Sequence, residues 1–282
     1  MGAISTLFAK KDSNRQRKRM RRDHRVVDPN RAAKKFGGCS ALALMTKAPR
    51  AGQVKTRLVP PLTNEEAAQL NRCFLQDTGA AISICCSGLS AQSPGRPIVR
   101  GVAVYTPVGS ESDYTDILPT DFSLLPQRGK NFGERLYFAA EDLFKCGFDA
   151  VCLIDSDSPT VPAGNFAQAI ELLSLPGDRI VLGPCDDGGY YLIGLKRLHR
   201  ELFERIDWST ERVFEQTSQR ATQIGVRIHE LPRGFDVDDR AALHRLCDEL
   251  LGRNARDSIA PQTTEFLREL IARHDRGRIW SL

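Results

Sequence analysis

The stretch AVCLIDSDSP, residues 150–159, decides the fold. Residues 150–154 are apolar at every position, and Asp155 follows at once. A short run that is apolar throughout is typical of a central parallel strand, which is covered on both faces. Ligands of open α/β sheets bind beyond the carboxyl ends of the strands, so we expect the acidic segment 155–157 to lie at a binding site.

Segments of the same kind alternate along the chain on both sides of this stretch. We predict further strands at 41–45, 102–105, 122–125, 179–182, 190–193 and 226–231, and helices at 64–84, 132–145, 165–173, 213–224 and 240–251. Thr63 and Glu66 have the spacing of a capping box for the first of these helices. Strands that alternate with helices predict an α/β protein with three layers and a mostly parallel sheet.

The charge of the chain divides it into unequal parts. Residues 1–37 hold twelve Lys and Arg against three Asp and Glu, whereas the remaining residues hold 28 against 32. The basic segment has little apolar surface to bury, so we predict a disordered tail. We favour a solvated extension or a mis-assigned translation start over a segment that binds nucleic acid or an anionic membrane. We assign residues 38–252 to one large domain, and residues 253–282 to a C-terminal extension with a helix near 265–273.

Composition excludes several classes of protein. The longest apolar runs fall well short of the roughly eighteen residues of a membrane helix, and the basic N-terminal segment lacks the apolar stretch of a secretory signal. The chain has eight cysteines but no C-x-x-C pair and no Cys/His cluster with zinc spacing. Buried free thiols suit a reducing compartment, so we expect a cytoplasmic protein.

The loop after the first predicted strand, residues 46–58, is a candidate phosphate-binding segment. Lys47, Lys55 and Arg57 can neutralise phosphate oxygens, and Gly52 lets the backbone approach a ligand closely. A surface loop with three solvated cations is an equally good interpretation by residue type alone.

Two acidic segments are candidate metal ligands. Asp155 and Asp157 can both reach a hard cation such as Mg²⁺ or Mn²⁺, which would bridge a diphosphate. Asp236 or Asp238, before the helix at 240–251, can complete the metal shell. In the alternative interpretation Asp238 or Asp239 caps that helix.

Residues 183–191 combine carboxylates, glycines and aromatic rings. Asp186, Asp187, Gly188, Gly189 and Tyr190 suit a tight loop pressed against a sugar or phosphate. The competing interpretation is an ordinary hairpin turn, which Asp-Gly favours by itself. We predict a substrate-binding loop.

Four segments together resemble a known family. Residues 45–58, 127–136, 183–195 and 208–210 are similar to those of a bacterial family of GT-A-type glycosyltransferases that includes members assigned to arsenosugar biosynthesis. The resemblance covers about residues 40–250. It implies a nucleotide-diphosphosugar transferase fold, a Rossmann-like α/β/α sandwich with a mixed sheet, and it places Gln127 among the substrate-binding residues.

The resemblance also ranks the metal ligands. Relatives commonly have Gly at the position of Asp155, so Asp157 is the safer ligand. We accordingly expect Asp157→Ala to abolish metal-dependent donor binding and Asp155→Ala to have a milder effect.

The function that follows is transfer of a sugar from a nucleotide-diphosphate sugar to a small acceptor, with Mg²⁺ or Mn²⁺ as cofactor. Asp186 or Asp187 is the candidate general base if the transfer inverts the anomeric centre. One alternative is nucleotidyl transfer, in which a phosphorylated acceptor attacks a nucleoside triphosphate. Another, of a different class, is an inactive nucleotide-binding or nucleic-acid-binding protein.

Overall fold

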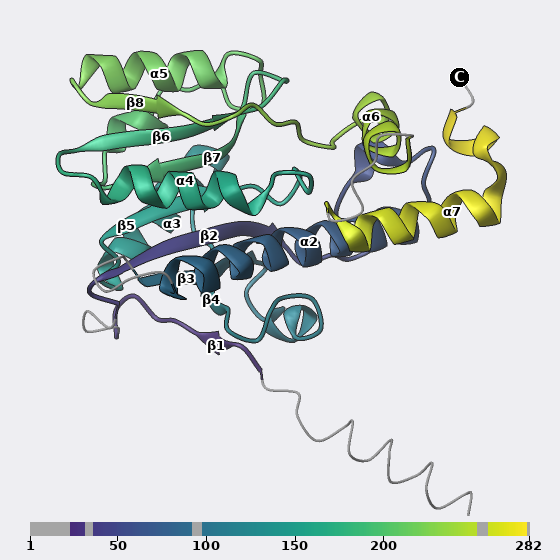
Figure 1. The fold of residues 1–282 in the computed structure, drawn as a ribbon, viewed down its shortest axis with the longest axis horizontal. Coiled ribbons are helices and arrows are strands. Elements are labelled where there is room, and N and C mark those ends of the chain that lie inside the picture. The colour runs from purple at the N-terminus through teal and green to yellow at the C-terminus, as the bar shows by residue number, and fades with distance from the viewer. Residues whose placement is uncertain (1–22, 32–35, 92–97, 253–258, 281–282) are drawn as a thin grey trace, which may run out of the picture.

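The described residues of the computed structural model, 23–31, 36–91, 98–252 and 259–280, form an eight-stranded mixed sheet with helices on both faces (Figure 1). The strand order is β1-β4-β3-β2-β5-β7-β6-β8, and β7 alone runs antiparallel to its neighbours. The strands are β1 (Arg25–Val26), β2 (Cys39–Lys47), β3 (Ile98–Thr106), β4 (Ser123–Pro126), β5 (Ala150–Ile154), β6 (Arg179–Pro184), β7 (Tyr190–Leu195) and β8 (Arg227–Glu230). The predicted three-layer α/β fold with a mixed, mostly parallel sheet is confirmed.

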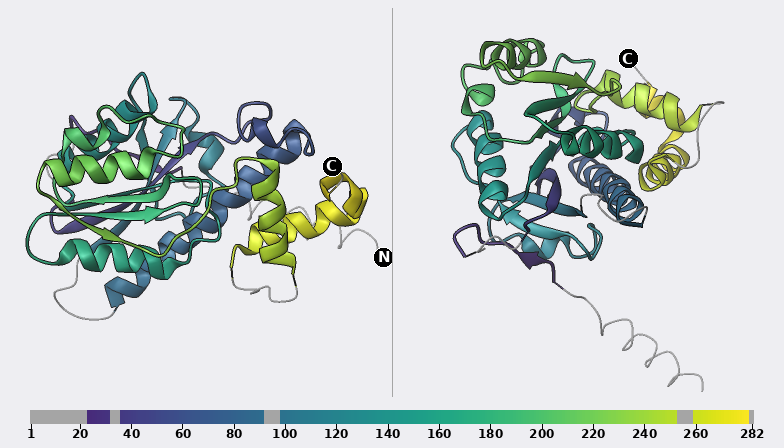
Figure 2. Two further views of the ribbon diagram at one scale, coloured as in Figure 1. Left: turned by 90° about the horizontal axis from the view of Figure 1, so that it is seen from above. Right: turned by 60° about the vertical axis from the view of Figure 1, so that its left-hand side comes forward.

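The helices divide between the two faces of the sheet and one end of it. Their bounds are α2 (Asn64–Ala91), α3 (Phe132–Lys145), α4 (Ala163–Ser174), α5 (Val213–Gln223), α6 (Arg240–Leu251) and α7 (Pro261–Trp280), with short 3-10 turns η1 (Thr56–Leu58), η2 (Glu111–Tyr114) and η3 (Arg200–Phe203). Helices α2 and α4 cover one face, and α3 and α5 cover the other (Figure 2). Helices α6 and α7 gather around α2 beyond the carboxyl ends of the parallel strands (Figure 1).

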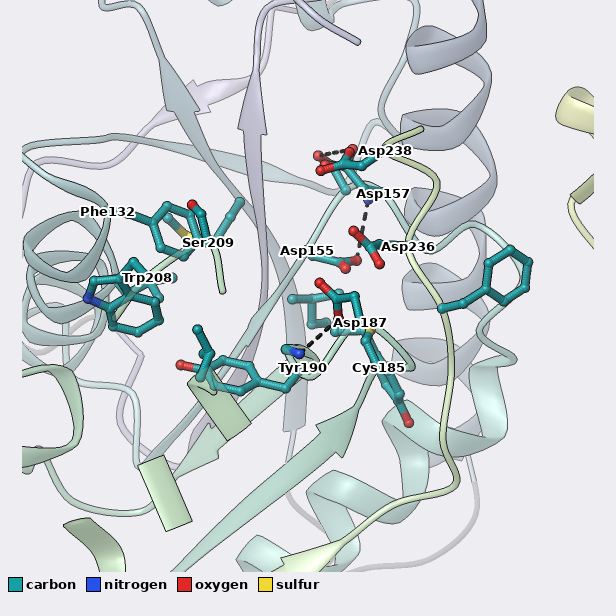
Figure 3. A pocket seen from close by; sticks show the side chains of 18 of the residues that line it. Phe132, Asp155, Asp157, Cys185, Asp187, Tyr190, Trp208, Ser209, Asp236 and Asp238 are labelled. Carbon is teal, nitrogen blue, oxygen red and sulfur yellow. Dashed lines mark hydrogen bonds between the residues drawn. The ribbon is translucent and has the colours of Figure 1, made fainter. Parts of the chain in front are cut away.

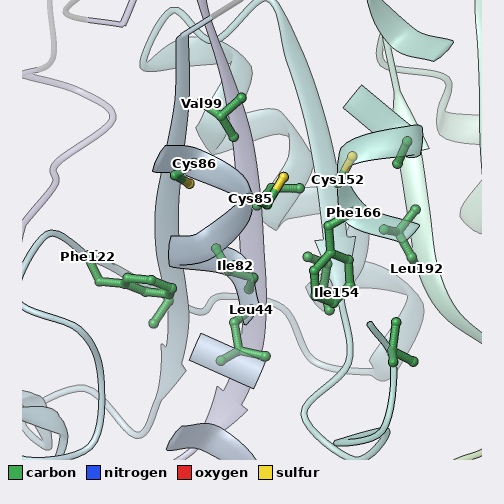
Figure 4. Packing of buried hydrophobic residues seen from close by; sticks show 14 of the residues in the cluster. Leu44, Ile82, Cys85, Cys86, Val99, Phe122, Cys152, Ile154, Phe166 and Leu192 are labelled. Atoms are coloured by element: carbon green, nitrogen blue, oxygen red, sulfur yellow. The ribbon is translucent and has the colours of Figure 1, made fainter. Parts of the chain in front are cut away.

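Strand β5 is apolar at every position because both of its faces are covered. Ala150, Cys152 and Ile154 belong to the core under α2 and α4 (Figure 4), whereas Val151 and Leu153 belong to the core under α3 and α5. Alternate residues of a strand point to opposite faces, so one five-residue run contributes to two cores. All eight cysteines of the chain are buried and free, as predicted.

A third apolar cluster joins α6 and α7 to the first half of α2. Leu70 and Phe74 of α2 pack there with Leu246 and Leu267, and the extended segment 235–237 adds Phe235 and Val237. Helix α7 begins at Pro261, before the predicted helix at 265–273, and a distant residue caps this end. The predicted capping box of α2 is confirmed, since Thr63 and Glu66 exchange backbone-to-side-chain hydrogen bonds of 2.8 and 3.2 Å.

The cap of α7 is Asp77, which lies on α2. Its buried carboxylate accepts hydrogen bonds from the backbone N–H groups of Gln262 and Thr263 at 3.0 and 2.8 Å, and from the Thr263 hydroxyl at 2.6 Å. Burial raises the pKa of Asp77, and these hydrogen bonds counteract part of the effect. One side chain on α2 therefore satisfies the first turn of α7.

We expect Asp77→Ala to lower the free energy of unfolding by about 2 kcal/mol, because three hydrogen bonds at a buried helix terminus are lost. Denaturant titration followed by circular dichroism measures the change. Asp239→Ala is the matched control, since Asp239 gives α6 a single exposed cap, at 2.8 Å to the Ala242 N–H, and should cost about 1 kcal/mol or less. Equal losses in both variants would contradict the role assigned to Asp77.

Residues 23–31, which lie within the segment predicted to be a basic tail, pack against the sheet. Within the described part of this segment, β1 pairs in parallel with β4, Val27 is buried, and the ring nitrogens of His24 lie 3.2 Å from the carbonyl oxygens of Phe122 and Tyr114. The open edge of β4 offers backbone partners that local composition does not reveal. Residues 1–22 and 32–35, which carry most of the basic charge of the tail, lie outside the described residues.

No helix within the described ranges is both long and apolar enough to cross a bilayer.

Candidate functional site

A cavity of about 830 Å³ opens at the carboxyl ends of β2 and β5 and beside the β6–β7 hairpin. Most of the predicted site residues line it: Lys47, Arg57, Gln127, Asp155, Asp157, Asp186, Asp187, Gly189, Tyr190, Asp236 and Asp238. Five chain segments far apart in sequence thus meet at the edge of the sheet that the sequence predicted. Lys55, Gly52 and Gly188 are not among the lining residues.

Backbone pairing brings the two acidic segments together. The Val237 N–H donates to the Asp157 carbonyl at 2.9 Å, and the Asp155 N–H donates to the Tyr191 carbonyl at 2.9 Å. Phe235 and Val237 enter the third apolar cluster, so the alternation of an extended chain turns Asp236 and Asp238 toward the cavity. Asp239 caps α6, which confirms the capping interpretation for that residue.

Lys55 neutralises one pair of these carboxylates. Its ammonium lies 2.7 Å from Asp157 and 2.9 Å from Asp238, and it also donates to the Val237 carbonyl at 2.9 Å. The Lys55 side chain is only 3% exposed. Burial lowers the pKa of this lysine, but the two carboxylates outweigh that effect and raise it above its ordinary value. Lys55 is therefore engaged with protein acceptors at the place predicted for a metal.

A second group of acids faces the cavity beside this ion pair (Figure 3). Asp155, Asp187 and Asp236 lie close together. One carboxylate oxygen of Asp187, one of Asp236 and the Sγ atom of Cys185 all lie within 4.8 Å of one another. Asp155 accepts hydrogen bonds from the Ser158 hydroxyl at 2.8 Å and from the Asp157 N–H at 3.3 Å.

Ionisation is unfavourable for two carboxyl groups of this second group. Burial and the neighbouring Asp157 raise the pKa of Asp155 well above its usual range. Burial, followed by repulsion from Asp187 and Asp238, raises the pKa of Asp236 to about 6. Burial and the nearby carboxylates also raise the pKa of the Cys185 thiol, which keeps the thiol protonated at neutral pH. The group is thus short of positive charge, unlike the pair that Lys55 bridges.

The β6–β7 hairpin is both a tight turn and part of the cavity wall. Cys185 and Gly189 close the turn with a 3.0 Å hydrogen bond, and Gly188 has a φ of +88°. A Cβ at Gly188 would lie 2.1 Å from the Glu211 carbonyl, so only glycine fits there. Both interpretations of the segment, hairpin and cavity loop, therefore describe its geometry.

The two aspartates of the hairpin have different surroundings. Asp186 pairs with Arg245 of α6 at 2.5 Å, and Arg233 lies 3.8 Å from its other oxygen. Asp187 accepts a hydrogen bond from the Gly189 N–H at 2.8 Å and faces Asp236. The ion pairs attach the hairpin to α6, while Asp187 turns to the acidic group.

The remaining predicted residues have mainly structural contacts. The Gln127 amide donates to the Thr46 and Val104 carbonyls at 3.2 and 2.8 Å, which ties the end of β4 to β2 and β3. Lys47 donates to the Gln53 carbonyl at 2.8 Å, and Gly52 has a φ of +72° in the turn before η1. Tyr190 lines the cavity, and burial raises the pKa of its hydroxyl.

Sequence reasoning gave no role to several residues that line the cavity. Phe132 and Trp208 form an aromatic wall away from the acids, and Arg135 and Arg245 add two guanidinium groups (Figure 3). Phe132 and Trp208 lie inside two of the family-like segments, 127–136 and 208–210, and this was the only signal that pointed to them.

Part of the chain matches a bacterial protein family. Residues 91–210 match the family "Uncharacterized protein conserved in bacteria (DUF2064)". The predicted resemblance to a bacterial family is confirmed. A search of curated proteins found no match.

A solved structure has a similar fold. A candidate nucleotide-diphospho-sugar transferase from Desulfovibrio desulfuricans G20 is 28% identical, with a TM-score of 0.70 over 84% of this chain and 96% of that chain. The chain has the fold of that class of transferases.

Two other structures are more distant. Glucosyl-3-phosphoglycerate synthase from Mycobacterium tuberculosis is 11% identical, with a TM-score of 0.43 over 88% of this chain and 84% of that one. A cytidylyltransferase from Leptospira borgpetersenii is 9% identical, with a TM-score of 0.42 over 87% and 98%. At these scores neither structure decides between sugar and nucleotidyl transfer.

Proposed function

We propose that the protein is a metal-dependent transferase that moves a sugar from a nucleotide-diphosphate sugar to a small acceptor. The observation that carries the proposal is the group of Asp155, Asp187 and Asp236, whose carboxyl groups meet at the strand ends of an 830 Å³ cavity, where burial and neighbouring carboxylates raise the pKa of Asp155 and Asp236. The similarity to the Desulfovibrio protein supplies the class of substrate.

The donor set of this group fits a hard divalent cation. Its carboxylate oxygens are ligands that Mg²⁺ and Mn²⁺ accept, and a protonated Cys185 thiol does not compete with them. We propose Asp155, Asp187 and Asp236 as the ligands. When bound, the cation would neutralise the negative charge of the diphosphate leaving group.

Asp157 and Asp238, which the sequence favoured, are proposed instead as partners of Lys55. Their carboxylates already share a buried ammonium at 2.7 and 2.9 Å. A divalent cation at the same place would face like-charge repulsion from Lys55.

Lys47 and Arg57 remain the proposed phosphate contacts. Both line the same cavity as the acidic group, Lys47 at the end of β2 and Arg57 in η1. Lys55 is left out of this role because its ammonium is bonded to three protein oxygens.

Neither aspartate of the hairpin is proposed as a general base. Asp186 is engaged by Arg245 and Arg233, and Asp187 belongs to the cation-binding group. Asp186 instead holds the hairpin against α6, which fixes one wall of the cavity.

Isothermal titration calorimetry of the purified chain with a panel of nucleotide-diphosphosugars, with and without Mn²⁺, tests the proposal. We expect at least one donor to bind tightly only when Mn²⁺ is present, and to be hydrolysed slowly without an acceptor. Release of pyrophosphate from a nucleoside triphosphate and a sugar phosphate would instead favour nucleotidyl transfer. Absence of metal-dependent binding across the panel would contradict both activities.

A further inference from the structure

Two aromatic rings form a corner in the cavity wall away from the acidic group. The rings of Phe132, at the start of α3, and Trp208, after η3, have centroids 5.2 Å apart and planes inclined at 69° (Figure 3). Both rings line the cavity, and Phe132 is 48% exposed. We refer to Phe132 and Trp208 as the aromatic corner.

Two neighbouring residues fix the position of the Trp208 indole. A Cβ at Gly133 would lie 2.4 Å from Trp208 Nε1 and 2.9 Å from the Phe203 carbonyl, so a side chain there would displace the ring. On the other side of Trp208, Ser209 adopts the left-handed backbone region with a φ of +65°, which non-glycine residues rarely do. Strained backbone of this kind gathers at functional sites. Gly133 and the backbone conformation of Ser209 thus hold Trp208 in this position.

Phe132 does not serve the core. Leu136, one turn further along α3, is buried in the cluster under that helix, whereas Phe132 is nearly half exposed at the N-terminus of α3. Leaving a phenyl group in water forgoes the burial that usually favours it. The Arg135 guanidinium, 6.0 Å from the ring centroid, adds a cationic group on the same wall.

We propose that the aromatic corner is a stacking subsite for a ring-shaped group of the substrate, with the diphosphate held by the acidic group and its cation. This inference rests on the proposed function. The apolar face of a nucleobase or of a sugar ring has the chemistry that an aromatic side chain recognises by stacking. The corner and the acids lie in one cavity, so one molecule can reach both.

The protein carries its own reporter for this contact. The chain has two tryptophans, Trp208 and Trp280, so Trp280→Phe leaves Trp208 as the only source of indole fluorescence. We would titrate this variant, in the presence of Mn²⁺, with nucleoside diphosphates, nucleotide-diphosphosugars and free monosaccharides. Calorimetry on the same samples reports binding independently of fluorescence.

We expect binding to quench Trp208 emission, and we expect Phe132→Leu to weaken the same ligand about tenfold, since base–aromatic stacking contributes roughly a factor of ten or more. Phe132→Leu keeps an apolar side chain and removes only the aromatic face. Ile84→Ala, at a 65% exposed position on α2, is the control for loss of exposed apolar surface and should leave affinity unchanged.

The results of the titrations distinguish a nucleobase from a sugar ring as the stacked group of the ligand. Quenching by nucleoside diphosphates alone supports a stacked base, whereas quenching that needs a sugar-bearing ligand supports a stacked sugar ring. Calorimetric binding without a change in Trp208 emission, with full affinity retained in Phe132→Leu, would overturn the aromatic corner and leave the proposed function intact. If calorimetry detects no binding at all, the proposed function fails and this inference fails with it.

Discussion

Asp236→Asn is expected to abolish Mn²⁺-dependent donor binding and, at the same time, to stabilise the metal-free protein. The raised pKa of Asp236, about 6, means that its ionisation costs more free energy in the folded state, where it is buried and faces other carboxylates, than in the unfolded chain. Removing that charge relieves repulsion from Asp187 and Asp238 and should raise the free energy of unfolding by about 1 kcal/mol after allowance for solvent screening. Affinity for Mn²⁺ should fall by at least about tenfold, or roughly 1.4 kcal/mol.

Thermal unfolding with and without MnCl₂ measures both effects in one experiment. Mn²⁺ should raise the melting temperature of the unmodified protein but not of Asp236→Asn. Asp157→Asn is the matched control, because it removes a carboxylate from the other pair, next to Lys55. That variant should be less stable without metal and keep its response to Mn²⁺. The reverse pattern, with the response lost in Asp157→Asn alone, would restore the ligand ranking made from sequence.

Lys55→Met should destabilise the protein by about 2 kcal/mol. The substitution leaves Asp157 and Asp238 facing each other without a counter-ion. Loss of one partner from a fully buried pair costs roughly 3–5 kcal/mol, and the value here is smaller because the two carboxylates are 32% and 45% exposed. Urea unfolding measures the loss, and Lys47→Met, which removes an exposed lysine at the end of β2, should change stability by less than about 0.5 kcal/mol.

For Lys55→Met we also expect a stronger response to metal, although the variant is less stable without it. Without the ammonium, Asp157 and Asp238 become available to a divalent cation, so Mn²⁺ should stabilise Lys55→Met more than it stabilises the unmodified protein. An unchanged response to Mn²⁺ would show that Lys55 does not keep cations away from this pair.

Local pattern was sufficient to predict the central elements of the fold. Strand β5 and helices α3 and α6 begin and end at the predicted residues because their hydrophobic periodicity and their caps are all local. Strand β1 and the start of α7 were not predictable in this way. The first depends on the open edge of β4, and the second on the Asp77 carboxylate of another helix.

The location of the candidate site was predictable from the sequence, but the roles of its individual residues were less so. The position of Asp155 and Asp157 after a buried strand brought them to the correct edge of the sheet. What sequence could not show is the reach of Lys55, whose backbone φ of +49° directs a side chain that belongs to the predicted phosphate loop into the acids instead. The partners of Asp186 on α6 were hidden for the same reason, since such contacts join residues far apart in the chain.

The three members of the acidic group come from the ends of β5, the β6–β7 hairpin and the extended segment after β8. None of these segments can hold a cation alone, and they meet only when the β5–β7–β6–β8 half of the sheet is complete. A cation can therefore be held there only after these segments have met. Its effect falls on the unfolding rate, so metal should lengthen the lifetime of the folded chain while leaving the speed of folding almost unchanged.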